Sequence, residues 1–65
     1  MKTMNEINNI ICHVMTDNDF DRILEAAYDR DDTDKRVAYN GKRRLVRALN
    51  KYGLTLNEWD AWDAM

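Results

Sequence analysis

The 65-residue sequence contains no proline, only two glycines, and a single cysteine and histidine. Because few residues break helices or form tight turns, helix is favoured throughout. Cys12 has no second cysteine with which to form an intramolecular disulfide, which points to a reducing cytoplasm. No apolar run approaches the roughly 18 residues of a membrane span, and residues 1–9 lack the apolar segment of a signal peptide. We therefore expect a cytoplasmic protein that does not enter the membrane.

Metal-binding motifs are also scarce. Cys12 and His13 are adjacent and would point about 100° apart on a helix, whereas a zinc site needs three or four ligands at matching spacings. We interpret Cys12 as a half-buried packing residue and His13 as an exposed one. The run 17–21 begins like a calcium-binding loop, but Arg22 and Tyr28 stand where that loop requires glycine and glutamate. We expect neither a metal nor a cofactor.

Three carboxylates near the C-terminus, Glu58, Asp60 and Asp63, are the remaining candidates for catalysis. Acid–base chemistry requires a pocket that shifts a carboxylate pKa toward the working pH. A helical chain of only 65 residues offers no such pocket, so we expect no enzymatic activity.

Apolar residues recur at spacings of three and four, the pattern of helices with one buried face. The pattern predicts three main helices at about 4–15, 17–30 and 34–52 and a short C-terminal helix at about 56–64. The predicted buried positions of the first two helices are Met4, Ile7, Ile10, Ile11, Val14 and Met15, then Phe20, Ile23, Leu24, Ala27 and Tyr28. Those of the third are Ala38, Leu45, Val46, Ala48, Leu49 and Tyr52. The predicted fold is all-α, a compact small helical bundle forming a single domain of residues 1–65.

Capping residues support these boundaries, because threonine and aspartate side chains accept hydrogen bonds from the free amides of a helix start. The predicted caps are Thr3 with Glu6, Thr16 or Asp17, Thr33, and Thr55 with Glu58. At the end of the third helix, Gly53 suits the left-handed position of a Schellman stop, in which Leu54 would contact Leu49.

The third helix has one ambiguous point, Asn40–Gly41. This dipeptide favours a hairpin turn when alternating apolar residues flank it. Here Lys42, Arg43 and Arg44 follow, so a continuous helix is the main prediction and a break or kink at Gly41 the alternative. In a continuous helix, Gly41 would lie near the apolar face and allow another helix to approach.

Charged residues are segregated along the chain. Residues 1–34 hold nine acids and three bases, residues 35–53 hold seven bases and no acid, and the last twelve residues hold three acids. The second helix is predicted to present an acidic face made of Asp17, Asp21, Glu25, Asp29 and Asp32. Such a row can imitate phosphates and occupy a basic groove of a nucleic-acid-handling protein, as small acidic inhibitors from phages do.

The basic third helix supports an alternative. Its candidate nucleic-acid-binding residues are Arg36, Lys42, Arg43, Arg44, Arg47 and Lys51. A row of bases is what phosphate binding requires, although pairing with the acids of the second helix would also account for it. A helix-turn-helix with the last helix in the major groove is disfavoured, because that helix carries acids and no base.

Aromatic residues near the C-terminus supply a candidate protein interface, made of Tyr52, Trp59, Trp62 and Met65. Exposed tryptophans are frequent interface anchors, whereas buried ones would only cover the core. Self-association through this edge would add burial that so short a chain lacks. We therefore predict a small protein–protein interaction module, an inhibitor, adaptor or regulatory protein of phage or bacterial type, with nucleic-acid binding as the alternative.

Overall fold

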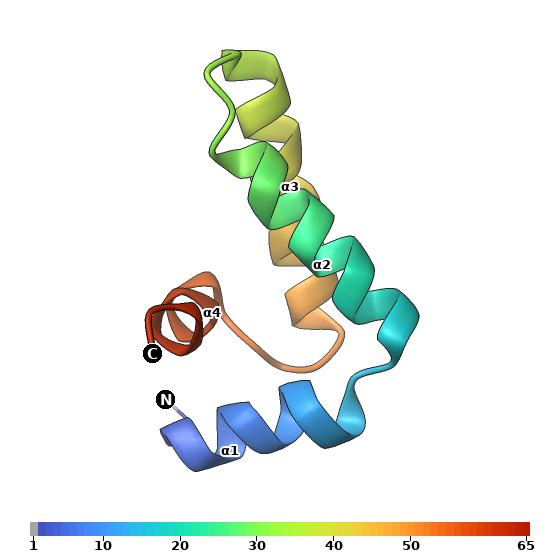
Figure 1. The fold of residues 1–65 in the computed structure, drawn as a ribbon, viewed down its shortest axis with the longest axis vertical. Coiled ribbons are helices and arrows are strands. Elements are labelled where there is room, and N and C mark those ends of the chain that lie inside the picture. Colours follow the sequence, from blue (N-terminus) through green and yellow to red (C-terminus); the bar gives the residue numbers. More distant parts are fainter. Residues whose placement is uncertain (1) are drawn as a thin grey trace.

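The computed structural model describes residues 2–65 and consists of helices and connections, with no strand in that range. The helices are α1 (Met4–Asn9), which continues as a π-helical turn η1 (Ile10–Val14), α2 (Asp17–Arg30), α3 (Lys35–Asn50) and α4 (Leu56–Asp63). The predicted all-α fold with three main helices and a short C-terminal helix is thus confirmed (Figure 1). Among residues 2–65, no helix combines the length and the apolar character that a membrane span requires.

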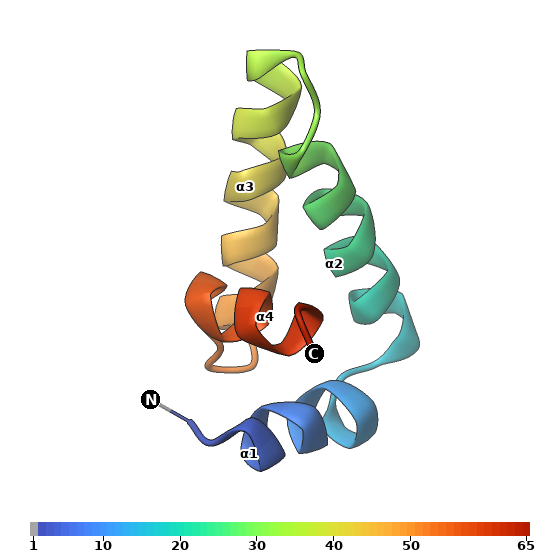
Figure 2. The same ribbon diagram turned by 60° about the vertical axis from the view of Figure 1, so that its left-hand side comes forward.

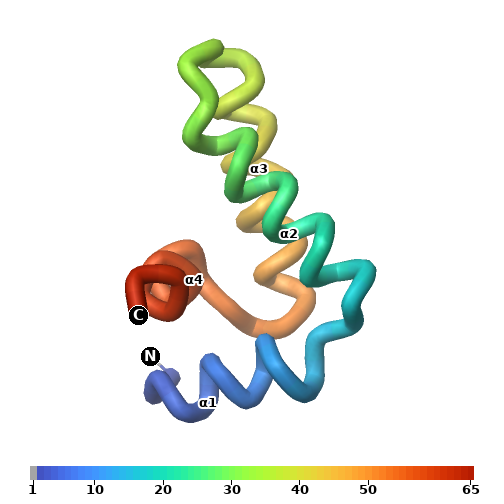
Figure 3. The backbone as a smooth tube through the Cα atoms, in the orientation of Figure 1, coloured from blue at the N-terminus to red at the C-terminus, as the bar shows by residue number. Residues whose placement is uncertain are grey.

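The molecule is elongated, with principal extents of 34 × 21 × 18 Å. α2 and α3 form an antiparallel hairpin, and α1 and α4 lie at the end of this hairpin that is away from the connection between α2 and α3 (Figures 1 and 2). After α3, the chain returns to place α4 near α1, so the two ends of the described chain lie in the same part of the molecule (Figure 3). We refer to residues 2–26 and 45–65, which include α1 and α4, as the base, and to residues 27–44 as the distal hairpin.

The core lies in the base. Its buried apolar residues are Ile7, Ile11, Met15, Ile23, Ala26, Leu45, Leu49, Leu54 and Trp59. All four helices contribute to it or to the half-buried layer around it, which includes Phe20, Tyr52 and Trp62. At about 25 cal/mol per Å² of apolar surface removed from water, this cluster supplies the main stabilisation of the fold.

The π turn changes which residues of the first helix are buried. The amide of Met15 donates to the carbonyl of Ile10 over 2.8 Å, one residue further back than in an α-helix. The wider turn brings Met15 onto the face of Ile7 and Ile11, so the buried residues are spaced by four. Val14, predicted to be buried, is 58% exposed, and that prediction was wrong.

Cys12 lies in the same π turn and is exposed, although a half-buried position was predicted. The reason is again the geometry of the turn, which gives the core-facing positions to Ile11 and Met15. His13 is exposed, as predicted.

α2 is rotated relative to the prediction. Ile23 and Ala26 are buried, whereas Leu24 is 44% exposed and Tyr28 80% exposed. The cause is the contact with α3, because α2 meets α3 with the side that carries Ala26, Asp29 and Arg30. Because Leu24 and Tyr28 lie on the other side of the helix, their predicted burial was wrong.

Gly41 explains the close approach of α2 and α3. α3 is continuous through this residue, and Gly41 is buried, so the main prediction for this helix is confirmed. A Cβ atom at Gly41 would lie 2.6 Å from the amide nitrogen of Arg30, 2.8 Å from Cβ of Asp29 and 2.9 Å from the carbonyl oxygen of Ala26. No side chain fits there unless the two helices move apart.

The predicted helix ends are largely confirmed. Both capping boxes form, and Thr16 caps α2 by accepting from the amide of Asp19. Asp34, and not Thr33, caps α3 by accepting from the amides of the first turn. Gly53 has a φ of 69°, and the amide of Leu54 donates to the carbonyl of Leu49 over 3.0 Å, which completes the Schellman stop.

Candidate functional site

The aromatic residues of α4 belong mainly to the core. Trp59 is 1% exposed, and the Phe20 ring meets it edge-on at a centroid distance of 6.5 Å. Trp62 is half-buried, and its ring centroid lies 5.3 Å from that of Trp59. Its Nε1 donates a hydrogen bond to Oδ1 of Asn8 over 3.1 Å. Trp59 is therefore not accessible as the surface anchor that we predicted, because α4 lies with this side against the core. Of the four predicted interface residues, Met65 is the most exposed, at 77%.

Tyr52, also predicted for the interface, takes part in a polar cluster that joins the start of α2 to the end of α3. The Tyr52 hydroxyl donates a hydrogen bond to Asp19 and accepts one from the amide of Thr16 at 3.3 Å. Asp19 also forms an ion pair with Lys51 at 2.8 Å. The hydrogen bonds from Lys51 and Tyr52 lower the pKa of Asp19 from 3.8 to about 2. The same contact with Asp19 raises the pKa of Lys51. Lys51 and Tyr52 thus stabilise the fold.

Two of the three C-terminal carboxylates, Glu58 and Asp60, have structural partners. Glu58 is buried and accepts from the amide of Thr55 at 2.9 Å and from the amide of Lys2 at 2.9 Å. These hydrogen bonds, that from Thr55 first, lower the pKa of Glu58, opposite to what a general acid needs. Asp60 pairs with Arg30 at 2.9 Å and joins α4 to α2.

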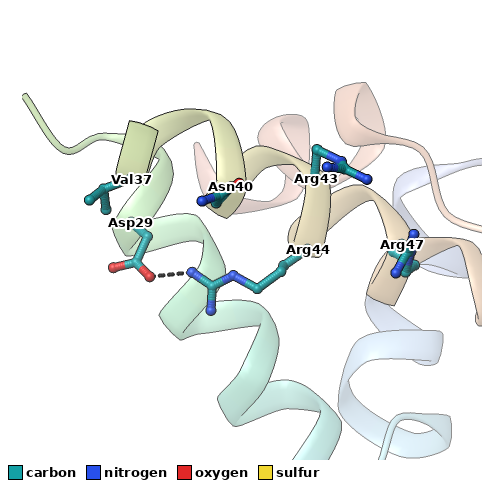
Figure 4. Close-up of a pocket in the computed structure, with 6 residues that line it drawn as sticks. All are labelled: Asp29, Val37, Asn40, Arg43, Arg44 and Arg47. Atoms are coloured by element: carbon teal, nitrogen blue, oxygen red, sulfur yellow. Dashed lines mark hydrogen bonds and ion pairs between the residues drawn. The ribbon is translucent and has the colours of Figure 1, made fainter. Parts of the chain in front are cut away.

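α3 presents several bases that remain unpaired. Arg44 forms an ion pair with Asp29, so internal pairing accounts for Arg44 and for Lys51. The other predicted nucleic-acid-binding residues, which make no ion pair with any residue in the range 2–65, are Arg36, Lys42, Arg43 and Arg47. Figure 4 shows Arg44 reaching Asp29 across the hollow between the helices, while Arg43 and Arg47 extend from α3 without a partner among the residues drawn.

The outer face of α3 combines these bases with apolar groups. Arg36, Tyr39, Arg43, Val46 and Asn50 are spaced alternately by three and four and lie along one line of the helix, which we call the basic stripe. Tyr39 is 62% exposed, and the guanidinium of Arg43 lies 5.8 Å from the centre of its ring. A shallow groove runs along this stripe and is also lined by Lys42 and Arg47.

The outer face of α2 has the opposite charge. Asp17, Asp21, Leu24, Tyr28 and Asp31 are spaced alternately by four and three and form what we call the acidic stripe. All five residues are exposed. Asp31 lies 3.9 Å from Arg30, whereas Asp17 and Asp21 make no ion pair with a described residue.

The acidic face predicted from the sequence corresponds only in part to this stripe. Asp17 and Asp21 belong to it, and Glu25 and Asp32 flank it. Asp29 lies on the side of α2 that faces α3, where it pairs with Arg44. Leu24 and Tyr28 were missed as surface residues because they fit the apolar spacing of a buried face. Their spacing with Asp17, Asp21 and Asp31 was the signal that they are exposed.

The two stripes lie on opposite sides of the hairpin. Ala26, Asp29 and Arg30 mark the side of α2 that contacts α3 at Gly41. At about 100° per residue, Leu24 and Tyr28 lie roughly opposite this side. Counting about 100° per residue along α3 likewise places Tyr39 and the rest of the basic stripe opposite Gly41. Figure 2 shows α2 and α3 side by side, with their distal parts extending beyond α1 and α4.

α4 does not resemble a recognition helix in its surface chemistry. Its exposed residues include Asn57, Asp60 and Asp63, and the helix carries no base. Over residues 2–65, no group of three histidine, cysteine, aspartate or glutamate side chains is placed to hold a metal ion. No known protein family, curated protein or solved structure matches the chain.

Proposed function

We propose that this protein is a non-enzymatic protein-interaction module that binds a basic surface of another protein through the acidic stripe of α2. The observation that carries the proposal is the exposure of Tyr28, at 80%, and of Leu24, at 44%, in the middle of a row of acids. Tyrosine is enriched among the residues that dominate binding energies. The surrounding acids would steer and orient a basic partner.

The length of the stripe suits a groove. From Asp17 to Asp31 the helix rises about 21 Å, at 1.5 Å per residue. A basic groove that normally holds a nucleic-acid backbone is a surface of matching charge, and occupying it would make the protein an inhibitor or regulator of phage or bacterial type. We place this activity in the cytoplasm.

A photo-cross-linking amino acid at position 28, in the full-length protein in its own cells, tests this proposal. Tyr39 provides a matched control, because it is an exposed tyrosine on the opposite side of the hairpin. We expect cross-links to a different protein from position 28, few such cross-links from position 39, and loss of the position-28 products when Asp21→Lys is added. Cross-links to a different protein from position 39 alone, or none from position 28, would overturn the proposal.

Nucleic-acid binding is the second candidate, and the unpaired Arg36, Arg43 and Arg47 on the outer side of α3 favour it. The anisotropy of a labelled DNA duplex and of an RNA strand, titrated with the protein at low and physiological salt, tests it. Phosphate contacts predict binding that weakens steeply as salt rises and that Arg43→Glu with Arg47→Glu abolishes. Absence of binding at low salt would eliminate this candidate.

A further inference from the structure

The acidic and basic stripes match one another as helix surfaces. Each alternates spacings of three and four residues, the pattern by which two helices pack side by side. Each has two apolar or aromatic members, Leu24 and Tyr28 on α2 and Tyr39 and Val46 on α3. Asp21 and Asp31 flank the first pair, whereas Arg36 precedes Tyr39 and Arg43 lies between Tyr39 and Val46.

One molecule cannot bring its two stripes together. They lie on opposite sides of the α2–α3 hairpin, which the contact at Gly41 and the Arg44–Asp29 ion pair hold closed. The ion pairs between α2 and α3 involve Asp19 and Asp29, neither of which belongs to the acidic stripe. The complementary charges are therefore available to a second molecule.

We propose that the acidic stripe of one copy docks on the basic stripe of a second copy of this chain. The inference rests on the proposed function in one respect, since it uses the same face of α2. A second copy would then cover the surface that binds the partner protein, and self-association would limit partner binding as the concentration of the protein rises.

The geometry determines the kind of association. Because the two docking surfaces differ, pairing leaves a free basic stripe on one copy and a free acidic stripe on the other, so the assembly does not stop at a dimer unless a ring closes. One helix face on each side buries less than the about 1,000 Å² of a stable interface. The association is therefore weak, and it weakens further with salt because its charges are exposed.

The association of copies can be measured by sedimentation equilibrium. The pure protein is examined over a wide concentration range, at low and at high salt. We expect the weight-average mass to rise with concentration at low salt, to pass twice the monomer mass, and to return toward the monomer at high salt. A monomer at every concentration, or association that salt does not weaken, would overturn the inference.

Two variants sharpen the test by complementation. Asp21→Lys with Tyr28→Ala disables the acidic stripe, and Arg36→Glu with Arg43→Glu disables the basic stripe. The side chains of all four residues are exposed, so a helical circular dichroism spectrum is expected for both variants. Each variant alone should be monomeric, whereas an equal mixture should form a dimer that grows no further. Asp63→Lys on α4, with the same charge change as Asp21→Lys, should still associate like the wild type.

The outcomes separate this inference from the proposed function. Association by either variant alone, or a mixture that stays monomeric, would overturn docking between the stripes. The cross-links from position 28 to a different protein would still appear in that case, because they do not depend on a second copy. Conversely, loss of those cross-links with intact self-association would overturn the proposed partner only.

Discussion

The base and the distal hairpin of this molecule are held together by different forces. The base contains Ile7, Leu49, Trp59 and the other large buried side chains, so burial of apolar surface stabilises it. The distal hairpin buries little apolar volume and depends on the backbone contact at Gly41 and on the Arg44–Asp29 ion pair. A short chain can thus place its stabilising core at one end and still leave the outer faces of two long helices exposed along most of their length.

The largest expected effect is the loss of the base. Trp59→Ala should cost about 3–5 kcal/mol, the range for truncating a buried aromatic side chain, which is close to the whole stability of a domain of this size. Circular dichroism should show a largely unfolded chain. Trp62→Ala should remain folded, because Trp62 is only half-buried. Equal stability of the Trp59 variant and the wild type would contradict the assignment of the core.

Gly41→Ala tests the distal hairpin. The added methyl group meets backbone atoms of α2, and overpacking of this kind costs about 1–3 kcal/mol, partly offset by the higher helix propensity of alanine. Hydrogen exchange should quicken in the distal hairpin and change less in the base. Asn40→Ala, at an exposed neighbouring position, serves as the control and should be neutral or slightly stabilising. A stabilising Gly41→Ala would mean that the helices do not approach so closely.

The polar cluster at Asp19 predicts a pH dependence. Because the folded state lowers the pKa of Asp19 from 3.8 to about 2, the contact contributes stability above pH 3.8 and loses it as the pH falls toward 2. The lowered pKa values of Glu6 and Glu58 act in the same direction. Urea unfolding from pH 7 to pH 2 should therefore show a steeper loss for the wild type than for Asp19→Asn. Parallel curves would contradict the Asp19 contacts with Lys51 and Tyr52.

Arg44→Ala should have a small effect on stability, about 0–1 kcal/mol, because the ion pair with Asp29 lies near the surface. A double-mutant cycle with Asp29→Ala measures the interaction itself. A coupling energy well above this range would show that the ion pair, and not Gly41, holds the distal hairpin closed.

The sequence predicted the helices and their ends well because those depend on local chemistry. Thr3, Thr55 and Gly53 act through neighbours within a few residues, and their caps form as predicted. The buried faces of the first and second helices were harder to predict. The π turn before Met15 and the rotation of α2 that exposes Leu24 are consequences of tertiary packing.

The candidate surfaces follow the same division. The basic character of α3 was predicted from composition, since residues 35–53 hold no acid, but which of its bases pair with α2 was left open. The acidic stripe was only partly predicted, because Tyr28 has the spacing of a core residue and its exposure depends on where Gly41 places α3. The spacing of the tryptophans in α4 could not show whether Trp59 is buried or exposed.

The most direct test of the division between core and binding face compares two adjacent residues of α2. Ile23 is fully buried and Leu24 is 44% exposed. By urea unfolding, Ile23→Ala should lose about 2–5 kcal/mol, whereas Leu24→Ala should stay within about 0.5 kcal/mol of the wild type. Equal losses, or a larger loss for Leu24→Ala, would place Leu24 in the core and contradict the acidic stripe as a free surface.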